Sequence, residues 1–169
     1  MKRALVFMVA AVIFATALPG CGPYTFNPNL PTHIKTLAIP LAKNPRTFKY
    51  GAERTLTDAL IDEFVRDGTL DVADEATADS KLTVEIVNYK KEAKAYTAGE
   101  TVQKYNLALV LSLTFMDLTS GQVLWQEPNF YDAVEYNTTG PNAETEDEAF
   151  QRLCEDIAVK VVNRAMQGW

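Results

Sequence analysis

The chain has 169 residues, with 16 Lys or Arg against 22 Asp or Glu, so its formal net charge at pH 7 is −6. This acidic balance argues against a general nucleic-acid-binding protein, which would carry a basic footprint. It also argues against broad electrostatic attraction to an anionic membrane surface. The length fits one domain with a hydrophobic core of ordinary size.

The N-terminus has the three parts of a secretory signal. Two basic residues are followed by an uncharged apolar run over residues 4–18, and the small residue Gly20 then precedes Cys21. The run is shorter than the roughly 20 apolar residues that cross a bilayer as a helix, so we expect a cleavable signal over residues 1–20. The alternative is an ordinary signal peptide followed by an incidental cysteine.

The residues around Cys21 resemble a bacterial lipoprotein box. The resemblance implies that Cys21 is acylated and becomes the first residue of the mature protein. Because Gly22 stands where an aspartate favours retention at the inner membrane, the resemblance also implies the outer membrane. Stable anchoring takes more than one acyl chain, and a fully acylated cysteine supplies three. Residues 21–32 are then a lipidated tether, and residues 33–169 form one domain.

The first predicted elements are a strand, a helix and a short extended piece. Residues 34–41 are apolar on both faces, which favours an inner strand of a sheet. A helix is predicted over about residues 51–66, because Leu56, Leu60 and Phe64 recur four apart on one face. Gly68 fits a left-handed helix end. The extended piece is expected over residues 69–73.

A long antiparallel hairpin is predicted next. Residues 81–90 alternate between apolar and polar side chains and continue toward Tyr96, where residues 97–100 form a turn. Residues 105–116 alternate without a break, which predicts a strand. After a turn, the return strand starts at residues 123–126. Residues 131–144 are polar and mixed, so no regular element is predicted there.

A second helix is predicted to begin at Thr145, whose neighbours form a capping box with acids in the first turn. Two amphipathic helices and one sheet with an apolar face imply an α/β fold. We expect a two-layer sandwich, with a mixed, mostly antiparallel sheet of four to five strands covered by two helices. The helices should cover the face that carries Leu107, Leu109, Leu111 and Leu113.

No constellation of residues indicates catalysis. His33 is the only histidine, no glycine-rich loop follows a strand, and no Cys or His spacing fits a metal. We therefore expect no enzyme activity, no cofactor and no metal site. Four nearby acids are interpreted as a solvated loop (Asp71, Asp74, Glu75 and Asp79). Cys154 falls beside the apolar stripe of the last helix and is interpreted as a buried small residue.

One basic cluster stands out against the acidic whole. Lys90, Lys91 and Lys94 fall within five residues, and Lys104 lies across the predicted turn. Tyrosines are interleaved with these lysines. Such a cluster suits the phosphates and sugars of an anionic glycolipid. The alternative is a solvated hairpin end whose lysines protect an exposed strand edge.

Several segments together resemble the LptE family of lipopolysaccharide-assembly lipoproteins. The resemblance rests on Cys-Gly-Pro-Tyr-Thr-Phe at 21–26, on the strand and helix segments at 30–40 and 56–64, and on the Ala-Asp and Asp-x-Thr-x-Gly motifs at 78–82 and 117–125. It implies a lipid-anchored protein on the periplasmic side of the outer membrane. It further implies a plug and assembly partner for the LptD β-barrel that binds lipopolysaccharide.

Two other functions stay open at this point. Related motifs occur in periplasmic lipoproteins that activate peptidoglycan synthases, and an uncharacterised hydrolase is a third reading. A wall-directed activator needs a long arm, whereas about 11 residues precede the first strand here and reach at most roughly 40 Å. The short tether favours a partner in the membrane itself.

Overall fold

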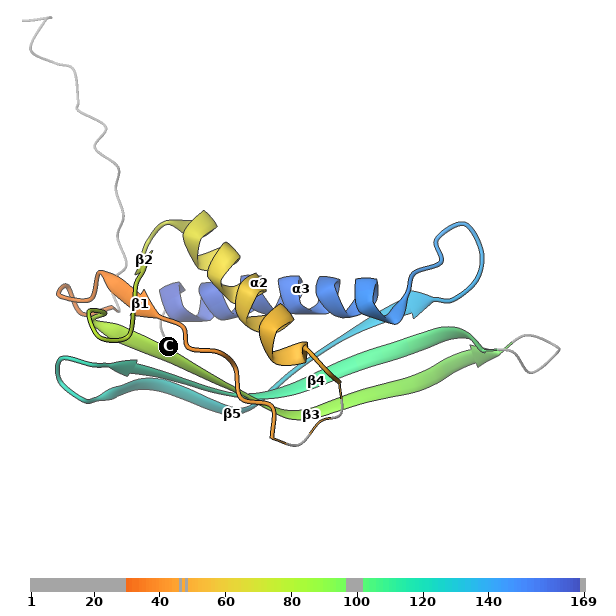
Figure 1. Cartoon of the computed structure of the whole chain (residues 1–169), viewed down its shortest axis with the longest axis horizontal. Coiled ribbons are helices and arrows are strands. Elements are labelled where there is room, and N and C mark those ends of the chain that lie inside the picture. The colour runs from red at the N-terminus through yellow and green to blue at the C-terminus, as the bar shows by residue number, and fades with distance from the viewer. Residues whose placement is uncertain (1–29, 46, 48, 97–101, 168–169) are drawn as a thin grey trace, which may run out of the picture.

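A computed structural model describes residues 30–45, 47, 49–96 and 102–167 (Figure 1). Its centre is an antiparallel meander of three long strands, which are β3 (Ser80–Tyr96), β4 (Val102–Asp117) and β5 (Val123–Asn137). Two short strands extend the sheet beside β3. β1 (Thr36–Ala38) runs parallel to β3, and β2 (Asp71–Val72) runs parallel to β1. The strand order is β2-β1-β3-β4-β5.

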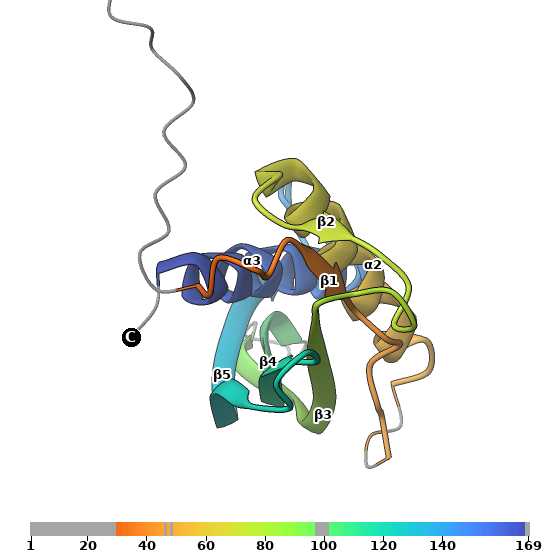
Figure 2. The same cartoon turned by 90° about the vertical axis from the view of Figure 1, so that its left-hand side faces the viewer.

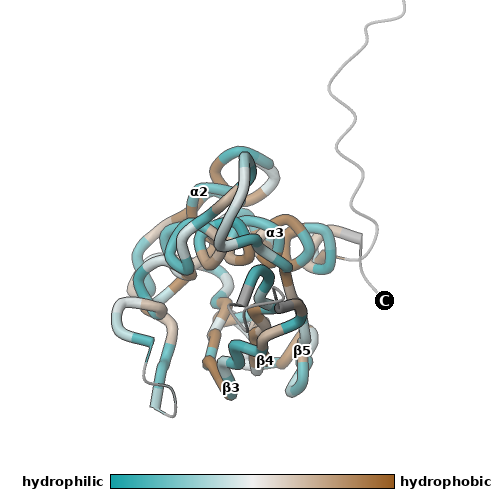
Figure 3. The backbone as a smooth tube through the Cα atoms, turned by 90° about the vertical axis from the view of Figure 1, so that its right-hand side faces the viewer, coloured by the Kyte–Doolittle hydropathy of each residue, from teal (hydrophilic) through white to brown (hydrophobic). Residues whose placement is uncertain are grey.

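Two helices cover one face of this sheet and leave the other face bare (Figures 1 and 2). They are α2 (Ala52–Asp67) and α3 (Glu146–Gln167). The tube coloured by hydropathy in Figure 3 shows hydrophobic residues in both layers. The predicted two-layer α/β sandwich with a mixed sheet is therefore confirmed.

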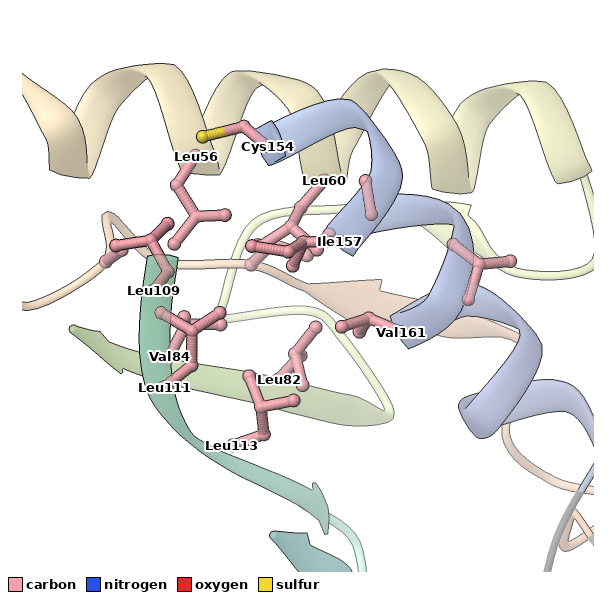
Figure 4. Close-up of a cluster of buried hydrophobic side chains, with 14 of the residues drawn as sticks. Leu56, Leu60, Leu82, Val84, Leu109, Leu111, Leu113, Cys154, Ile157 and Val161 are labelled. Carbon is pink, nitrogen blue, oxygen red and sulfur yellow. The ribbon is translucent and has the colours of Figure 1, made fainter. Parts of the chain in front are cut away.

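The hydrophobic core lies between the helices and the covered face of the sheet. Leu107, Leu109, Leu111, Leu113 and Phe115 are at most 1% exposed, because every second residue of β4 points toward the helices. Figure 4 shows leucines of β3 and β4 meeting the apolar side chains of both helices. Each such buried leucine contributes roughly 1.5–3 kcal/mol relative to an exposed one.

Local sequence explains where the helices begin and end. α2 is bounded by Gly51 and Gly68, with φ of 79° and 68°, a conformation that residues with a Cβ rarely adopt. The Gly68 N–H closes the helix on the carbonyl of Phe64 at 3.1 Å. α3 begins with the predicted capping box, since Thr145 N–H donates to Glu148 Oε2 at 2.8 Å and Glu148 N–H donates to Thr145 Oγ1 at 3.2 Å.

One expectation about the strands was wrong. β5 continues to Asn137, so the first half of the segment at 131–144 is a regular strand. The alternation there was obscured by Asp132, a charged residue on the helix-covered face. Its carboxylate pairs with Lys160 of α3 at 2.5 Å, and this partner offsets the cost of burying a charge. The expected turn at residues 97–100 lies outside the described residues.

Candidate functional site

The end of the sheet where the described chain begins is held by two carboxylates. The first belongs to Asp79, whose Oδ2 accepts hydrogen bonds from the backbone N–H groups of Lys35 and Thr36, each at 3.0 Å. The Thr36 hydroxyl adds a third bond at 2.9 Å. These bonds, led by that from Lys35, lower the pKa of Asp79. The interpretation of Asp79 as part of a solvated loop was therefore wrong, because this residue fixes β1.

The second carboxylate is Asp117, which ends β4 and is almost completely buried. It accepts hydrogen bonds from the Ser120 hydroxyl at 2.6 Å and from the Thr119 N–H at 2.8 Å. His33 Nε2 lies 2.9 Å from its Oδ2. The Ser120 hydroxyl is the main cause that lowers the pKa of Asp117 to about 2. The Ala-Asp and Asp-x-Thr-x-Gly motifs thus hold the fold together at this end.

Asp117 predicts a specific dependence of stability on pH. Because its pKa falls from 3.8 to about 2 on folding, its contribution is complete above pH 3.8 and is lost as the pH falls toward 2. In Asp117→Asn, we expect lower stability at neutral pH and a flatter loss of stability across this interval. Thermal unfolding followed by circular dichroism from pH 2 to pH 5 measures both effects. If stability changes with pH at the same slope in the two proteins, the prediction is wrong.

The predicted lysine cluster lies at the other end of the sheet, where β3 and β4 extend beyond α2 (Figure 1). The structure divides it between two faces. Lys90 stands opposite Ala108 on the bare face, and Lys104 on the same face pairs with Glu135 at 3.2 Å. Lys91 points toward the helices, and exposed Lys94 lies at an irregularity of β3. Strand alternation puts the neighbours Lys90 and Lys91 on opposite faces, and a register shift between Ile86 and Asn88 decides that Lys91 is the one that faces the helices.

Lys91 belongs to a polar and aromatic cluster that ties β3 to the start of α3. Its Nζ lies 2.7 Å from Glu146 Oε2 and 4.4 Å from the ring centre of Tyr105. Glu146 also accepts a hydrogen bond from the Tyr89 hydroxyl at 2.5 Å. Lys91 is the main cause that lowers the pKa of Glu146, and Glu146 in turn raises the pKa of Lys91. Burial, followed by Glu146, raises the pKa of Tyr89.

Lys49 is a member of this cluster that sequence reasoning missed. Its Nζ lies 3.6 Å from Glu146 Oε1 and 5.4 Å from the ring centre of Phe150. It also pairs with Asp147. No local pattern signalled this role, since Lys49 and Glu146 are distant in sequence. Lys49 and Lys91 are thus engaged by acids of the same chain.

Other residues offer little reactive chemistry. Cys154 is buried, and burial raises the pKa of its thiol to about 12, as expected for an inert packing residue. In the described part of the chain, no group of His, Cys, Asp and Glu side chains is arranged to hold a metal ion. Neither described helix is long and apolar enough to cross a membrane. Cys21 lies outside the described residues.

A groove on the outer side of the helical layer, between α2 and α3, has a volume of about 510 Å³. Most of its charged lining residues are acidic (Asp58, Asp62, Glu63, Glu155 and Asp156, with Arg66). Like-charge repulsion makes this groove unsuitable for an anionic ligand. An anionic ligand is better served by the lysines at the far end of β3 and β4.

These features define a class of protein, namely a small two-layer α/β sandwich. Solved structures share the fold. A protein from Xanthomonas campestris matches with a TM-score of 0.56 at 14% identity, over 84% of this chain and 89% of that one. An uncharacterised lipoprotein B from Nitrosomonas europaea matches with a TM-score of 0.56 at 10% identity, over 81% and 84%. A minor lipoprotein from Acinetobacter baumannii gives 0.50 at 12% identity, over 78% and 92%.

The family follows from the sequence itself. Residues 34–165 match the model of the lipopolysaccharide-assembly family LptE. The chain therefore belongs to the LptE family, as its motifs predicted. No curated protein sequence gives a significant match.

Proposed function

We propose that this protein is an outer-membrane lipoprotein subunit of the lipopolysaccharide transport and assembly translocon. The observation that carries the proposal is the family match over residues 34–165, which spans both helices and nearly all of the sheet. In this role the protein is anchored through acylated Cys21 on the periplasmic side of the membrane. It acts as plug and assembly partner of an LptD-like β-barrel and binds lipopolysaccharide.

The surface of the domain supports this role. The face of the sheet that no helix covers carries many polar and small side chains, such as Thr83, Ser112 and Thr114 on neighbouring strands, together with exposed Tyr131. A polar surface suits the water-filled lumen of a membrane barrel. The domain thus needs no membrane-spanning segment to work within the membrane plane, since its anchor is the acyl group.

Lipopolysaccharide binding is assigned to the bare face at the lysine end. Lys90 makes no ion pair with any described residue, and the partner of Lys104, Glu135, is itself exposed. Lys90 is therefore free to meet a phosphate, and Lys104 can do so by exchanging exposed Glu135 for the phosphate. Lys91 contributes less to lipopolysaccharide binding, because Glu146 already neutralises its charge. Lys94 lies at the strand edge next to this face.

Charge reversal tests this assignment. We expect Lys90→Glu combined with Lys104→Glu to weaken binding of purified lipopolysaccharide at least about tenfold, since charged hydrogen bonds contribute roughly 1.5–3 kcal/mol each. Lys35→Glu is the matched control, because Lys35 is an exposed lysine at the opposite end of the sheet. Equal affinities for the three proteins would eliminate the bare-face lysines as the site.

Depletion of the protein in its own bacterium tests the function as a whole. We expect newly made lipopolysaccharide to be retained inside the cell. An enzyme of the outer leaflet should then modify a smaller fraction of its lipid A, which is the quantity measured. Normal surface lipopolysaccharide together with altered peptidoglycan cross-linking would reject the proposal. That result would favour an activator of a peptidoglycan synthase.

A further inference from the structure

The outer half of β3 forms an open edge of the sheet. The chain runs along this edge only as far as Lys43, whose N–H donates to the carbonyl of Val84 at 2.9 Å and whose carbonyl accepts the N–H of Ile86 at 2.8 Å. Pro45, which lacks an N–H, then follows as the chain turns away. Among the described residues, no segment pairs with β3 beyond Ile86 on this side.

Backbone groups of three residues point to the open side. Val84 and Ile86 have side chains that face the helices, and their backbone groups bond to Lys43, on the side away from β4. Residues of β3 with helix-facing side chains therefore direct their backbone N–H and C=O groups to the open side. Beyond the register shift, Tyr89, Lys91 and Ala93 are the helix-facing residues. The open edge over residues 88–93 is about 20 Å long, enough for a strand of about six residues.

On the opposite edge of the sheet, two backbone groups of β5 are satisfied by the protein's own side chains. On β5, the N–H of Ala133 donates to the Asp132 carboxylate at 2.9 Å. The carbonyl of Glu135 accepts a hydrogen bond from Arg152 of α3 at 3.1 Å. Side chains that satisfy edge groups in this way prevent unwanted strand pairing. The fold therefore protects one edge of the sheet and leaves the other available.

The open edge also differs in charge from the rest of the molecule. Five lysines form ion pairs with acids of the same chain (Lys49, Lys81, Lys91, Lys104 and Lys160). Lys43 and Lys94 are exposed, form no ion pair with the described residues, and stand near the two ends of the open stretch. Lysines outnumber acids along this edge, with Lys43, Lys90, Lys91 and Lys94 against Glu85 and Glu92, so the edge is locally basic in a chain of net charge −6.

We propose that the open edge of β3 binds an extended, carboxylate-bearing segment of a partner protein by strand addition. Backbone hydrogen bonds to Tyr89, Lys91 and Ala93 supply affinity, and Lys43 and Lys94 select for acidic side chains. A second copy does not fit this site, because pairing two β3 edges would bring lysines together and the β5 edge is closed. The inference goes beyond the proposed function and does not depend on where lipopolysaccharide binds.

The test uses the full-length acylated protein in detergent micelles and a capped eight-residue peptide in which valine and glutamate alternate. We expect the peptide to slow amide hydrogen exchange at Tyr89, Lys91 and Ala93, measured by NMR spectroscopy. A peptide with lysine in place of glutamate should give no protection. Equal protection by both peptides, protection confined to β5, or no protection at these three amides would overturn the proposal.

Two sets of variants separate strand addition from a purely electrostatic contact. Ala93→Pro removes one outward N–H and should weaken binding of the acidic peptide about fivefold, whereas Ala93→Val keeps the N–H and the affinity. Lys43→Glu should weaken binding of the acidic peptide about threefold while leaving lipopolysaccharide binding unchanged. If Lys43→Glu instead loses lipopolysaccharide binding and leaves peptide protection intact, this edge lysine binds phosphate and the proposal is wrong.

Discussion

Replacing Leu111 with alanine is expected to lower the free energy of unfolding by about 3 kcal/mol. Leu111 is fully buried at the centre of β4, between Ile86 of β3 and Phe130 of β5. Figure 4 places it beneath the helical layer among other leucines. The substitution removes apolar contacts and leaves a cavity that the close-packed sandwich fills only in part. Urea titration of residues 22–169, followed by circular dichroism, measures the change.

Leu41→Ala is the matched control for this substitution. It makes the same chemical change at a side chain that is 59% exposed, so we expect a loss below about 1 kcal/mol. Similar losses for the two variants would contradict the proposed location of the core. A small loss at Leu111 alone would mean that the helices do not pack on β4 as described.

Replacing Cys21 with serine is expected to release the protein from the membrane. A serine cannot take the thioether-linked acyl group, so the proposed lipid anchor is lost. The membrane-bound fraction should therefore fall from nearly all of the protein to a small remainder, held only by its partners. Cell fractionation combined with radioactive palmitate labelling measures both the location and the acylation.

The second cysteine provides the control for this experiment. Cys154→Ser should remain labelled and membrane-bound, because Cys154 is buried in α3 and takes no part in anchoring. Continued palmitate labelling of the Cys21→Ser protein would show that acylation occurs elsewhere. The lipoprotein reading of residues 1–21 would then be wrong.

Periodicity in the sequence was sufficient to predict most of the fold. Unbroken alternation over residues 105–116 placed β4 and its buried face correctly, and the spacing of Leu56, Leu60 and Phe64 did the same for α2. The prediction failed at residues 131–137, where Asp132 interrupts the apolar pattern. Its burial depends on Lys160, and local sequence cannot reveal such a distant partner.

The lysine end was predicted less completely for a related reason. The sequence places Lys90, Lys91 and Lys94 together, but a register shift and strand alternation send Lys90 and Lys91 to opposite faces. Glu146 was explained by helix capping alone, whereas it also accepts hydrogen bonds from Tyr89 and Lys91. Contacts between residues so distant in the chain arise only when the helices pack on the sheet. The sequence therefore shows which residues are basic, and the fold decides which of them form ion pairs with acids of the same chain.

The most direct test of the central claim is affinity purification of the full-length protein from outer membranes after mild detergent extraction. We expect a large β-barrel protein to elute with it in about equal amounts, and lipopolysaccharide to accompany the pair. The Lys35→Glu protein should recover the same barrel and serves as a control for surface charge. Recovery of a peptidoglycan synthase without any barrel would contradict the account.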